Sequence, residues 1–357
     1  MSPNTDFSFS LPKELEATMP PEDRGIQRDQ VKLLVSSQKE QKLVHTTFTH
    51  IVDLLHPGDT LVVNISSTLN AAIPLIQKDL PELELRLCTA LPSNIWVVEI
   101  SEPGEDDLTR IPLIDAGKEI QLYGGGMVKL HTPYRQELRM TTGIEPVRLW
   151  IATLTLPTDL PSYLDLFGSP IRYRYVKKRW GRNYYQTIFG AEPGSVEMLS
   201  AGRAFTHELV TKLIVKGIQI APILLHCGLS SLGPDEPLVH EYYRVPPETA
   251  HCINSAKGIG KRIIAVGTTV LRALETVVDQ RGHIHGGEGW TQLAIRPSDE
   301  ILSIDGLLTG FHEPQASHLS ILSALMGEEQ LREVYSAAVQ NNYLWHEFGD
   351  LHLIFTK

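Results

Sequence analysis

Hydrophobic and polar positions along the chain change their spacing twice and divide the sequence into three stretches. In residues 1–68, two apolar runs typical of buried strands, Val31–Ser36 and Leu61–Ile65, flank Thr47–Leu55, which has helical spacing. From about Leu69 to Leu154 apolar and polar residues alternate, as they do in strands with one buried face. After that stretch, helical and strand-like spacings alternate again.

The middle stretch predicts a small all-β unit. Turn signals such as Glu102-Pro103-Gly104 and Gly124-Gly125-Gly126 separate short alternating segments, which is the spacing of a small antiparallel barrel or sandwich. The expected strands are Leu83–Leu87, Ile95–Ile100, Ile111–Leu113, Glu119–Leu122, Met127–Leu130 and Val147–Leu154. The predicted fold is therefore an α/β main domain (residues 1–68 and 155–357) with an inserted all-β domain, a small antiparallel barrel (residues 69–154).

The third stretch predicts alternating helices and strands. The expected helices are Phe205–Ile214, Pro246–Lys257, His318–Leu325 and Glu329–Asn341. The strand-like runs are Ile218–Leu225, Ile263–Val266, Ile301–Ile304, Leu307–Leu308 and Leu351–Phe355.

The sharpest local pattern is the segment from Gly258 to Glu275. The β-branched run Ile263–Val266 predicts a buried strand, and helical spacing resumes at Val270, so Gly267-Thr268-Thr269 forms a tight turn between them. Backbone N–H groups and two hydroxyls beside a helix N-terminus favour an anionic or hydroxyl-rich part of a ligand. The alternative is that Thr268 or Thr269 only caps the helix.

Composition narrows the class of protein. A chain of 357 residues predicts two domains, and a net charge of −10 argues against a globally basic nucleic-acid-binding surface. No apolar run approaches the ~20 residues of a membrane helix, and the N-terminal segment lacks a secretory signal pattern. Three distant cysteines indicate a reducing compartment and exclude a disulfide framework, so we expect a cytoplasmic protein.

Two small-residue turns precede the helix that Thr206 is expected to begin. Pro193-Gly194-Ser195 and Ala201-Gly202 permit close approach of a ligand to the backbone. Two ordinary surface turns explain the same residues.

Two histidines, His226 and His312, lie just after predicted strands. His226 lies where an apolar strand meets glycine, the edge where α/β proteins place their sites, although a structural role fits as well. Cys227 beside it would be a nucleophile only if His226 acted as its base, and neighbours in a strand point to opposite faces. His312, in a loop before a helix, is a candidate acid or base; Glu313 contributes or is a solvated carboxylate.

A basic and aromatic run, residues 172–185, suits contact with an RNA backbone and with stacked bases. The candidate RNA-binding residues are Arg174, Lys177, Lys178, Arg179 and Arg182. A solvated strand or loop whose aromatics are partly in the core is the alternative. His283 and His285 lie in a glycine-rich loop without further ligands in view, so no metal site is predicted.

Several motifs together resemble one family, the S-adenosylmethionine:tRNA ribosyltransferase-isomerases of queuosine biosynthesis. They cover nearly the whole chain in order, and as a set they are more specific than any one of them. The matching motifs are DFSFSLP (Asp6–Pro12), HPGDTLVVN (His56–Asn64), YQT (Tyr185–Thr187), PGS (Pro193–Ser195), AGRAFT (Ala201–Thr206), LHCGL (Leu225–Leu229), AVGTTVLRALE (Ala265–Glu275), GWTQLAIRP (Gly289–Pro297), DGLLTGFHEP (Asp305–Pro314) and YLWHEFGDLHLI (Tyr343–Ile354).

The resemblance implies a fold and a reaction. The fold is an α/β main domain with an inserted β-barrel. The reaction uses S-adenosylmethionine as a ribosyl donor, and a base removes a proton next to the sulfonium. The ribosyl unit passes to the aminomethyl group of a deazaguanine in a tRNA anticodon and rearranges to an epoxycyclopentane. Adenine and methionine leave, and the reaction requires no metal. The expected S-adenosylmethionine-binding residues are Gly194, Ser195, Gly202, Thr206, Gly267, Thr268 and Thr269, and the expected catalytic residues are His226, His312 and Arg272.

The chain departs from the family pattern on what we expect to be the acceptor side. The usual AGLHFT reads AGRAFT, with Arg203 and Ala204, and Ile65-Ser66-Ser67-Thr68 lacks the usual arginine. The turn after LHCGL continues to Leu232-Gly233-Pro234, and the usual TNFHLPxST has become the segment 309–317. Loss of an imidazole and a guanidinium changes a site built on proton transfer and charge.

Several interpretations stay open from the sequence. The leading one is an enzyme acting on the ribosyl part of S-adenosylmethionine with an acceptor other than tRNA. The others are the ordinary tRNA reaction, a paralogue that eliminates or cyclises S-adenosylmethionine, and a non-catalytic nucleoside-binding protein.

Overall fold

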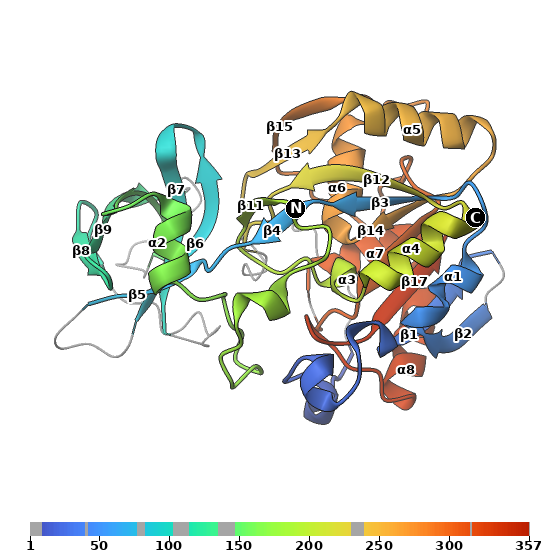
Figure 1. Ribbon diagram of the computed structural model, residues 1–357, viewed down its shortest axis with the longest axis horizontal. Helices are drawn as coiled ribbons and strands as arrows, with labels where there is room; N and C mark the ends of the chain where they lie inside the picture. The colour runs from blue at the N-terminus through green and yellow to red at the C-terminus, as the bar shows by residue number, and fades with distance from the viewer. Residues whose placement is uncertain are drawn as a thin grey trace.

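Two large sheets, lying side by side, organise the chain (Figure 1). The computed structural model describes residues 9–39, 42–76, 83–102, 114–134, 147–229, 239–314 and 316–356. A nine-stranded sheet, here the main sheet, has the strand order β15-β13-β12-β3-β14-β16-β17-β1-β2. A six-stranded sheet, here the barrel sheet, has the order β5-β6-β7-β10-β9-β8. Strands β4 (Ser66–Thr68) and β11 (Glu192–Ser195) form a small third sheet.

The centre of the main sheet is parallel. Strands β12 (Gln219–Leu225), β3 (Thr60–Asn64), β14 (Ile263–Val266) and β16 (Gly306–Gly310) run parallel to one another. Every residue of β3, β14 and β16 is buried, as expected where helices cover both faces of a parallel sheet. The flanking strands are β1 (Lys32–Ser37), β2 (Lys42–Thr47), β13 (Glu241–Val245), β15 (Gly287–Thr291) and β17 (Leu351–Phe355).

Two hydrophobic clusters, one on each face of the main sheet, show how the helices cover it. Successive residues of β3 alternate between them: Val62 joins one cluster, whereas Leu61 and Val63 join the other. The helices of the first cluster are α5 (Pro247–Gly258), α6 (Thr268–Val277), α7 (His318–Met326) and α8 (Glu328–Gln340). Those of the second are α1 (Ile51–Leu54), α3 (Ser200–Arg203) and α4 (His207–Lys216).

The barrel sheet is antiparallel and nearly closed. Its strands are β5 (Ala72–Pro74), β6 (Glu84–Leu91), β7 (Ile95–Ser101), β8 (Glu119–Leu122), β9 (Gly126–Pro133) and β10 (Leu149–Thr155). The two outer strands meet, because Leu75 bridges Leu122 and the Tyr123 N–H donates to Pro74 O at 2.9 Å. All six strands come from the part of the chain between β3 and β12, and α2 (Leu160–Phe167) packs Tyr163 and Leu164 into their core. The boundaries 68/69 and 154/155 stay predictions.

Most predicted elements are confirmed, and two are not. The run Ile301–Ile304 forms no strand, since the N–H groups of Leu302 and Ser303 donate to the Glu275 carboxylate at 3.0 and 2.8 Å instead of to a neighbouring strand. The predicted helix Thr47–Leu55 begins later: β2 ends at Thr47, a 3-10 turn follows, and α1 is short. Residues 111–113, expected as a strand, lie outside the described residues.

The early part of the chain packs along a late loop. Trp345 N–H donates to Leu15 O at 2.8 Å, and Ala17 N–H donates to Trp345 O at 3.2 Å. The Arg24 guanidinium donates to Phe348 O at 3.0 Å. Hydrogen bonds from residues near the N-terminal end of the described chain therefore hold the loop before β17 in place.

Candidate active site

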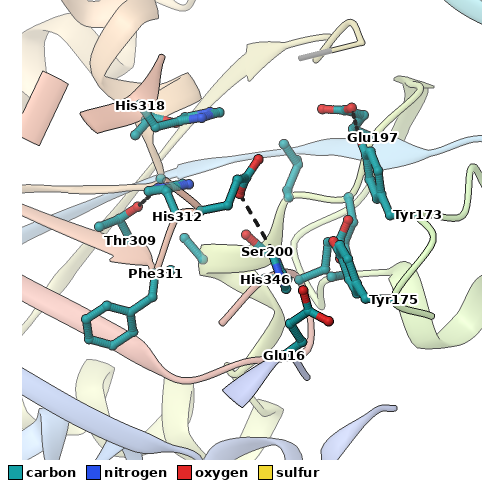
Figure 2. Close-up of a pocket in the computed structure, with 18 of the residues that line it drawn as sticks. Glu16, Tyr173, Tyr175, Glu197, Ser200, Thr309, Phe311, His312, His318 and His346 are labelled. Atoms are coloured by element: carbon teal, nitrogen blue, oxygen red, sulfur yellow. Dashed lines mark hydrogen bonds and ion pairs between the residues drawn. The ribbon is translucent and has the colours of Figure 1, made fainter. Parts of the chain in front are cut away.

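A cavity of about 620 Å³ lies beyond the carboxyl ends of β14 and β16. This is the edge at which open α/β sheets bind ligands. Figure 2 shows His312 and His318 on one side of it and Tyr173 and Tyr175 on the opposite side. Besides the residues at the ends of these two strands, the lining includes His318, Cys227 and residues from the segments 11–16, 173–175, 197–201 and 346–347.

The predicted Gly-Thr-Thr turn lies in the cavity wall. Gly267, Thr268 and Thr269 all line the cavity, and α6 begins at Thr268. Gly267 has φ 97°, a conformation that favours glycine, and a side chain there would meet the Ala201 Cβ at 3.6 Å. No side chain caps α6 from Gly267, so the alternative in which a threonine caps this helix is wrong. The N-terminus of α6 thus faces the cavity with two hydroxyls.

His312 lies in the same wall and is held on several sides. Its Nε2 lies 3.0 Å from Thr309 Oγ1, and its carbonyl accepts from Trp345 Nε1 at 3.0 Å. Its ring stacks on His318, with 4.2 Å between ring centroids and 3° between planes. Burial and the neighbouring His318 hold the pKa of His312 well below its usual value, and burial also lowers the pKa of His318. A neutral imidazole at pH 7 is the form that accepts a proton.

An aromatic and acidic wall faces the histidine pair. Tyr173 and Tyr175 stack at 5.9 Å, and Tyr175 stacks on His346 at 3.8 Å. The Tyr173 hydroxyl donates to Glu197, and the Tyr175 hydroxyl donates to Glu347. Burial raises the pKa of Glu347 and, together with the Glu347 charge, raises that of Tyr175. This wall suits a ligand that carries positive charge.

His346 occupies a strained position in this wall. Its φ of 72° is unusual for a residue other than glycine, and such residues cluster at functional sites. Its Nδ1 lies 3.7 Å from the Glu313 carboxylate, and its Nε2 is buried without a hydrogen-bond partner among the described residues. Burial alone would raise the pKa of Glu313, but the facing His346 outweighs it and lowers the pKa to about 2.

Four of the predicted ligand-binding residues lie outside the cavity lining. Ser195 Oγ is buried 2.7 Å from Ser66 Oγ, and Gly194 packs against the ring of His226. Gly202 lies against Thr187, and Thr206 accepts from Leu209 N–H at 3.2 Å as the N-cap of α4. The helix start at Thr206 is confirmed, whereas Gly194 and Ser195 belong to strand β11 (Glu192–Ser195) rather than to a turn.

Two of the predicted catalytic residues also lie outside the cavity lining. His226 Nδ1 lies 2.9 Å from Ser66 Oγ, and burial lowers the pKa of His226. Arg272 is buried in α6, where it pairs with Glu241 and donates to Leu293 O at 2.9 Å. Cys227 does line the cavity, but burial raises the pKa of its thiol well above the usual value, which opposes thiolate catalysis.

Arg203 and Ala204, the departures from AGLHFT, lie outside the lining too. The Arg203 guanidinium donates to Tyr184 O and pairs with Glu22, both at 2.7 Å, and Ala204 is buried in the core. The segment 232–234 lies outside the described residues.

The basic and aromatic run, residues 172–185, lies partly in the cavity lining and partly on the exposed surface. Arg174 lines the cavity, and Lys177, Lys178 and Arg179 are exposed just after it. Lys178 Nζ lies 4.0 Å above the Trp180 ring, while Arg182 pairs with Asp165 at 2.6 Å. The aromatics Trp180 and Tyr185 are buried, so this run exposes mainly its charges.

Sequence reasoning missed much of the acidic and aromatic wall. The residues not singled out as site residues are Glu16, Tyr173, Tyr175, Glu197, His318, His346 and Glu347. The sequence did contain a signal for these site residues. Charged or titratable residues stand among apolar ones in EPGSVEMLSAGRAFT (residues 192–206) and YLWHEFGDLHLI (residues 343–354). Among the described residues, no group of three or more His, Cys, Asp or Glu could hold a metal ion, and no helix is long and apolar enough to cross a membrane.

Comparison with known proteins identifies the family. The sequence model of the queuosine biosynthesis protein family matches residues 4–354. The chain is 34% identical, over 359 residues and 98% of each sequence, to the S-adenosylmethionine:tRNA ribosyltransferase-isomerase of Desulfitobacterium hafniense. The corresponding protein of Moorella thermoacetica is also 34% identical, over 98% of each sequence. The chain therefore belongs to the queuosine biosynthesis protein family.

A solved structure agrees with this assignment. The crystal structure of the S-adenosylmethionine tRNA ribosyltransferase of Thermotoga maritima is similar with a TM-score of 0.53 and 27% identity, over 98% of this chain and all of that one. The family predicted from the motifs is confirmed, and so is the prediction of a transferase-isomerase enzyme.

Proposed function

We propose that the chain binds S-adenosylmethionine in the cavity at the ends of β14 and β16 and transfers its ribosyl part, as the names of its relatives describe. The observation that carries the proposal is the composition of one cavity. A Gly-Thr-Thr turn at a helix N-terminus and a neutral histidine face a wall of tyrosines and carboxylates. The turn suits a ribose, and the wall suits a sulfonium cation.

Within this proposal each wall has a task. Thr268 and Thr269 bind hydroxyl groups of the ribose, and His312 takes the proton next to the sulfonium. Tyr173 and Tyr175 present aromatic faces to the positive charge, while Glu197 and Glu347 add negative charge behind them. Gly194, Ser195, Gly202 and Thr206 act from outside the lining, where Ser195 and His226 both contact Ser66 Oγ.

The experiment joins binding to product analysis. We expect calorimetry to detect S-adenosylmethionine binding, and chromatography to detect adenine and methionine once an acceptor is added. Methylthioadenosine as the product would replace transfer by elimination, and binding without turnover would favour a nucleoside-binding protein. No binding at all would overturn the proposal.

Thr268→Val is the matched test of the placement. We expect it to weaken S-adenosylmethionine about tenfold, the typical effect of one lost hydrogen bond. Thr211→Val, on the exposed surface of α4, is the control with unchanged affinity. Replacing Gly267 by valine is less informative, because a β-branched residue at φ 97° strains the backbone as well as filling the cavity.

For the acceptor we propose tRNA, which the relatives' names give, bound by the exposed cations beside the cavity. Arg174 lines the cavity, and Lys177, Lys178 and Arg179 follow it on the surface, so an RNA backbone there would deliver a base to the cavity. Arg182 extends this surface, paired with Asp165.

The test is a titration with an anticodon stem-loop RNA at low and moderate salt. Reversal of Lys177 and Lys178 to Glu should abolish salt-dependent binding and leave S-adenosylmethionine affinity unchanged. Reversal of two other exposed lysines, Lys42 and Lys212, is the control. No RNA binding at low salt would favour the second candidate, a non-tRNA acceptor. One observation supports it: Arg203 and Ala204 contribute neither a guanidinium nor an imidazole to the cavity lining.

A further inference from the structure

We propose that His318 is a positioning residue for proton transfer: its neutral ring, stacked on His312, stabilises the imidazolium that the reaction forms, and the two rings together resist a second proton. The inference rests on the proposed function, which makes His312 the base. The motif analysis did not single out His318, and the two residues come from different elements, the loop after β16 and the first turn of α7.

The geometry of the pair is fixed from both sides. On one side, Thr309 Oγ1 contacts His312 Nε2, the Tyr335 hydroxyl lies 3.3 Å from the His312 backbone nitrogen, and Trp345 donates to its carbonyl. On the other side, His318 begins α7, whose next residue, Leu319, is fully buried. Because both supports are rigid, the parallel stack at 4.2 Å does not depend on a ligand.

Stacked imidazoles can hold one proton but resist a second. Two positive charges at this distance in a buried site repel each other, so the pair titrates as a coupled unit. A neutral ring beside an imidazolium, by contrast, presents its π face to the charge and stabilises it. A neutral His318 therefore favours protonation of His312 during the reaction, whereas a charged His318 at acid pH opposes it.

The surrounding charges decide how many protons the pair holds. The groups that act on His312 are Glu313, His318, His346 and His352, with the Tyr335 hydroxyl nearby, and those that act on His318 are Glu313, Glu241 and Arg272. Of these, Glu313 favours protonation of both rings, while Arg272 is paired with Glu241 and its charge is largely offset.

The proton balance of the step is simple. The carbon next to the sulfonium loses its proton to Nδ1 of His312, the ring nitrogen that Thr309 does not engage. The electron pair of the C–H bond stays on that carbon beside the positive sulfur, so nothing is oxidised or reduced. His318 exchanges no proton and changes only the stability of the two states of His312.

The test compares the full chain with His318→Phe, which keeps an aromatic ring on His312 but removes the second titrating group. Histidine ring signals are followed by NMR from pH 4 to 8 with His312→Gln as the assignment variant, and the pH dependence of adenine release is measured in parallel. We expect the midpoint of His312 and the acid limb of kcat/KM to move upward together by about one pH unit, because one repelling charge is gone. His318→Gln, which loses the ring as well, should show the same upward shift and a lower kcat.

His285→Phe is the matched control, because His283 and His285 form an exposed, edge-on pair outside the cavity lining. An unmoved His312 midpoint in both His318 variants would overturn the inference, as would an equal shift in His285→Phe. The NMR arm needs no substrate, so it decides the coupling of the pair even if S-adenosylmethionine does not bind. A midpoint that moves while the acid limb stays fixed would show that His312 is not the base and would overturn the inference at that point.

Discussion

Buried charges in the barrel sheet and at the cavity are arranged in different ways. In the barrel sheet, Arg86 lies between Glu84 at 2.9 Å and Glu99 at 3.6 Å, and Arg148 pairs with Glu99 at 2.5 Å. All four side chains are at least nine-tenths buried, and two positive charges meet two negative ones. The charges of these four described side chains therefore balance one another.

At the cavity, tyrosine hydroxyls and a histidine contact the carboxylates. Glu197 and Glu347 accept from tyrosine hydroxyls, and Glu313 faces His346 instead of an arginine. The difference teaches that charge balanced by arginine inside the protein serves the fold, whereas carboxylates that line a cavity beside tyrosines and histidine are placed to act on a ligand as well. Three changes test this comparison, and the first has the largest expected effect.

Arg86→Met should break the neutral network in the barrel sheet. It leaves Glu84 and Glu99 buried with one arginine between them, which costs about 3–5 kcal/mol of the free energy of unfolding. Urea unfolding measures the loss. Lys129→Met, which removes an exposed pair with Glu119, is the control and should cost at most about 1 kcal/mol. If both variants lose equally little, the network is not a stabilising element and the comparison fails on this side.

His352 should make the main sheet sensitive to acid. Burial lowers its pKa to about 3, against about 6.5 in an unfolded chain, so between these values the unfolded state binds a proton that the folded state does not. Stability conferred by the neutral ring is therefore complete above pH 6.5 and falls by about 1.4 kcal/mol per pH unit as the pH drops toward 3. Urea unfolding at pH 7, 6 and 5 gives the free energy of unfolding at each pH. In His352→Gln this free energy should fall less steeply with decreasing pH, by up to about 1.4 kcal/mol per pH unit. An identical slope in both proteins would contradict the assignment.

His346→Asn should separate stability from binding. Asparagine tolerates the positive φ of this position, so relief of strain offsets the lost contacts with Tyr175 and Glu313, and the free energy of unfolding should change by less than about 1 kcal/mol. Calorimetry should nonetheless show weaker S-adenosylmethionine, because the unpartnered Nε2 is lost. A stability loss of several kcal/mol with unchanged affinity would place His346 with the structural charges of the barrel sheet.

Local patterns predicted the fold well because they report local physics. The β-branched run Ile263–Val266, its glycine and the helix after it form as the sequence indicates, and so do the alternating strands of the barrel sheet. The run Ile301–Ile304 fails because a distant carboxylate, Glu275, takes its N–H groups. Strands β13 and β15 were missed because their polar residues carry no clear alternation.

The candidate site was predictable only where its residues directly follow a predicted strand. The Gly267 turn and His312 lie in the cavity as expected, because a strand end and the turn after it fix their own place. The opposite wall was not predictable, since Tyr175, His346 and Glu16 meet only through contacts between distant segments. Spacing along a sequence does not contain such contacts.

The packing of the early segment on the Trp345 loop also sets a delay during synthesis. Arg24 and Phe348 are 324 positions apart, and both segments contribute residues to the cavity. At a ribosomal rate of ~5–20 residues per second, the early segment waits on the order of half a minute for its partner. All strands of the barrel sheet are therefore synthesised before the Trp345 loop, and the cavity lining is complete only after that loop has been made.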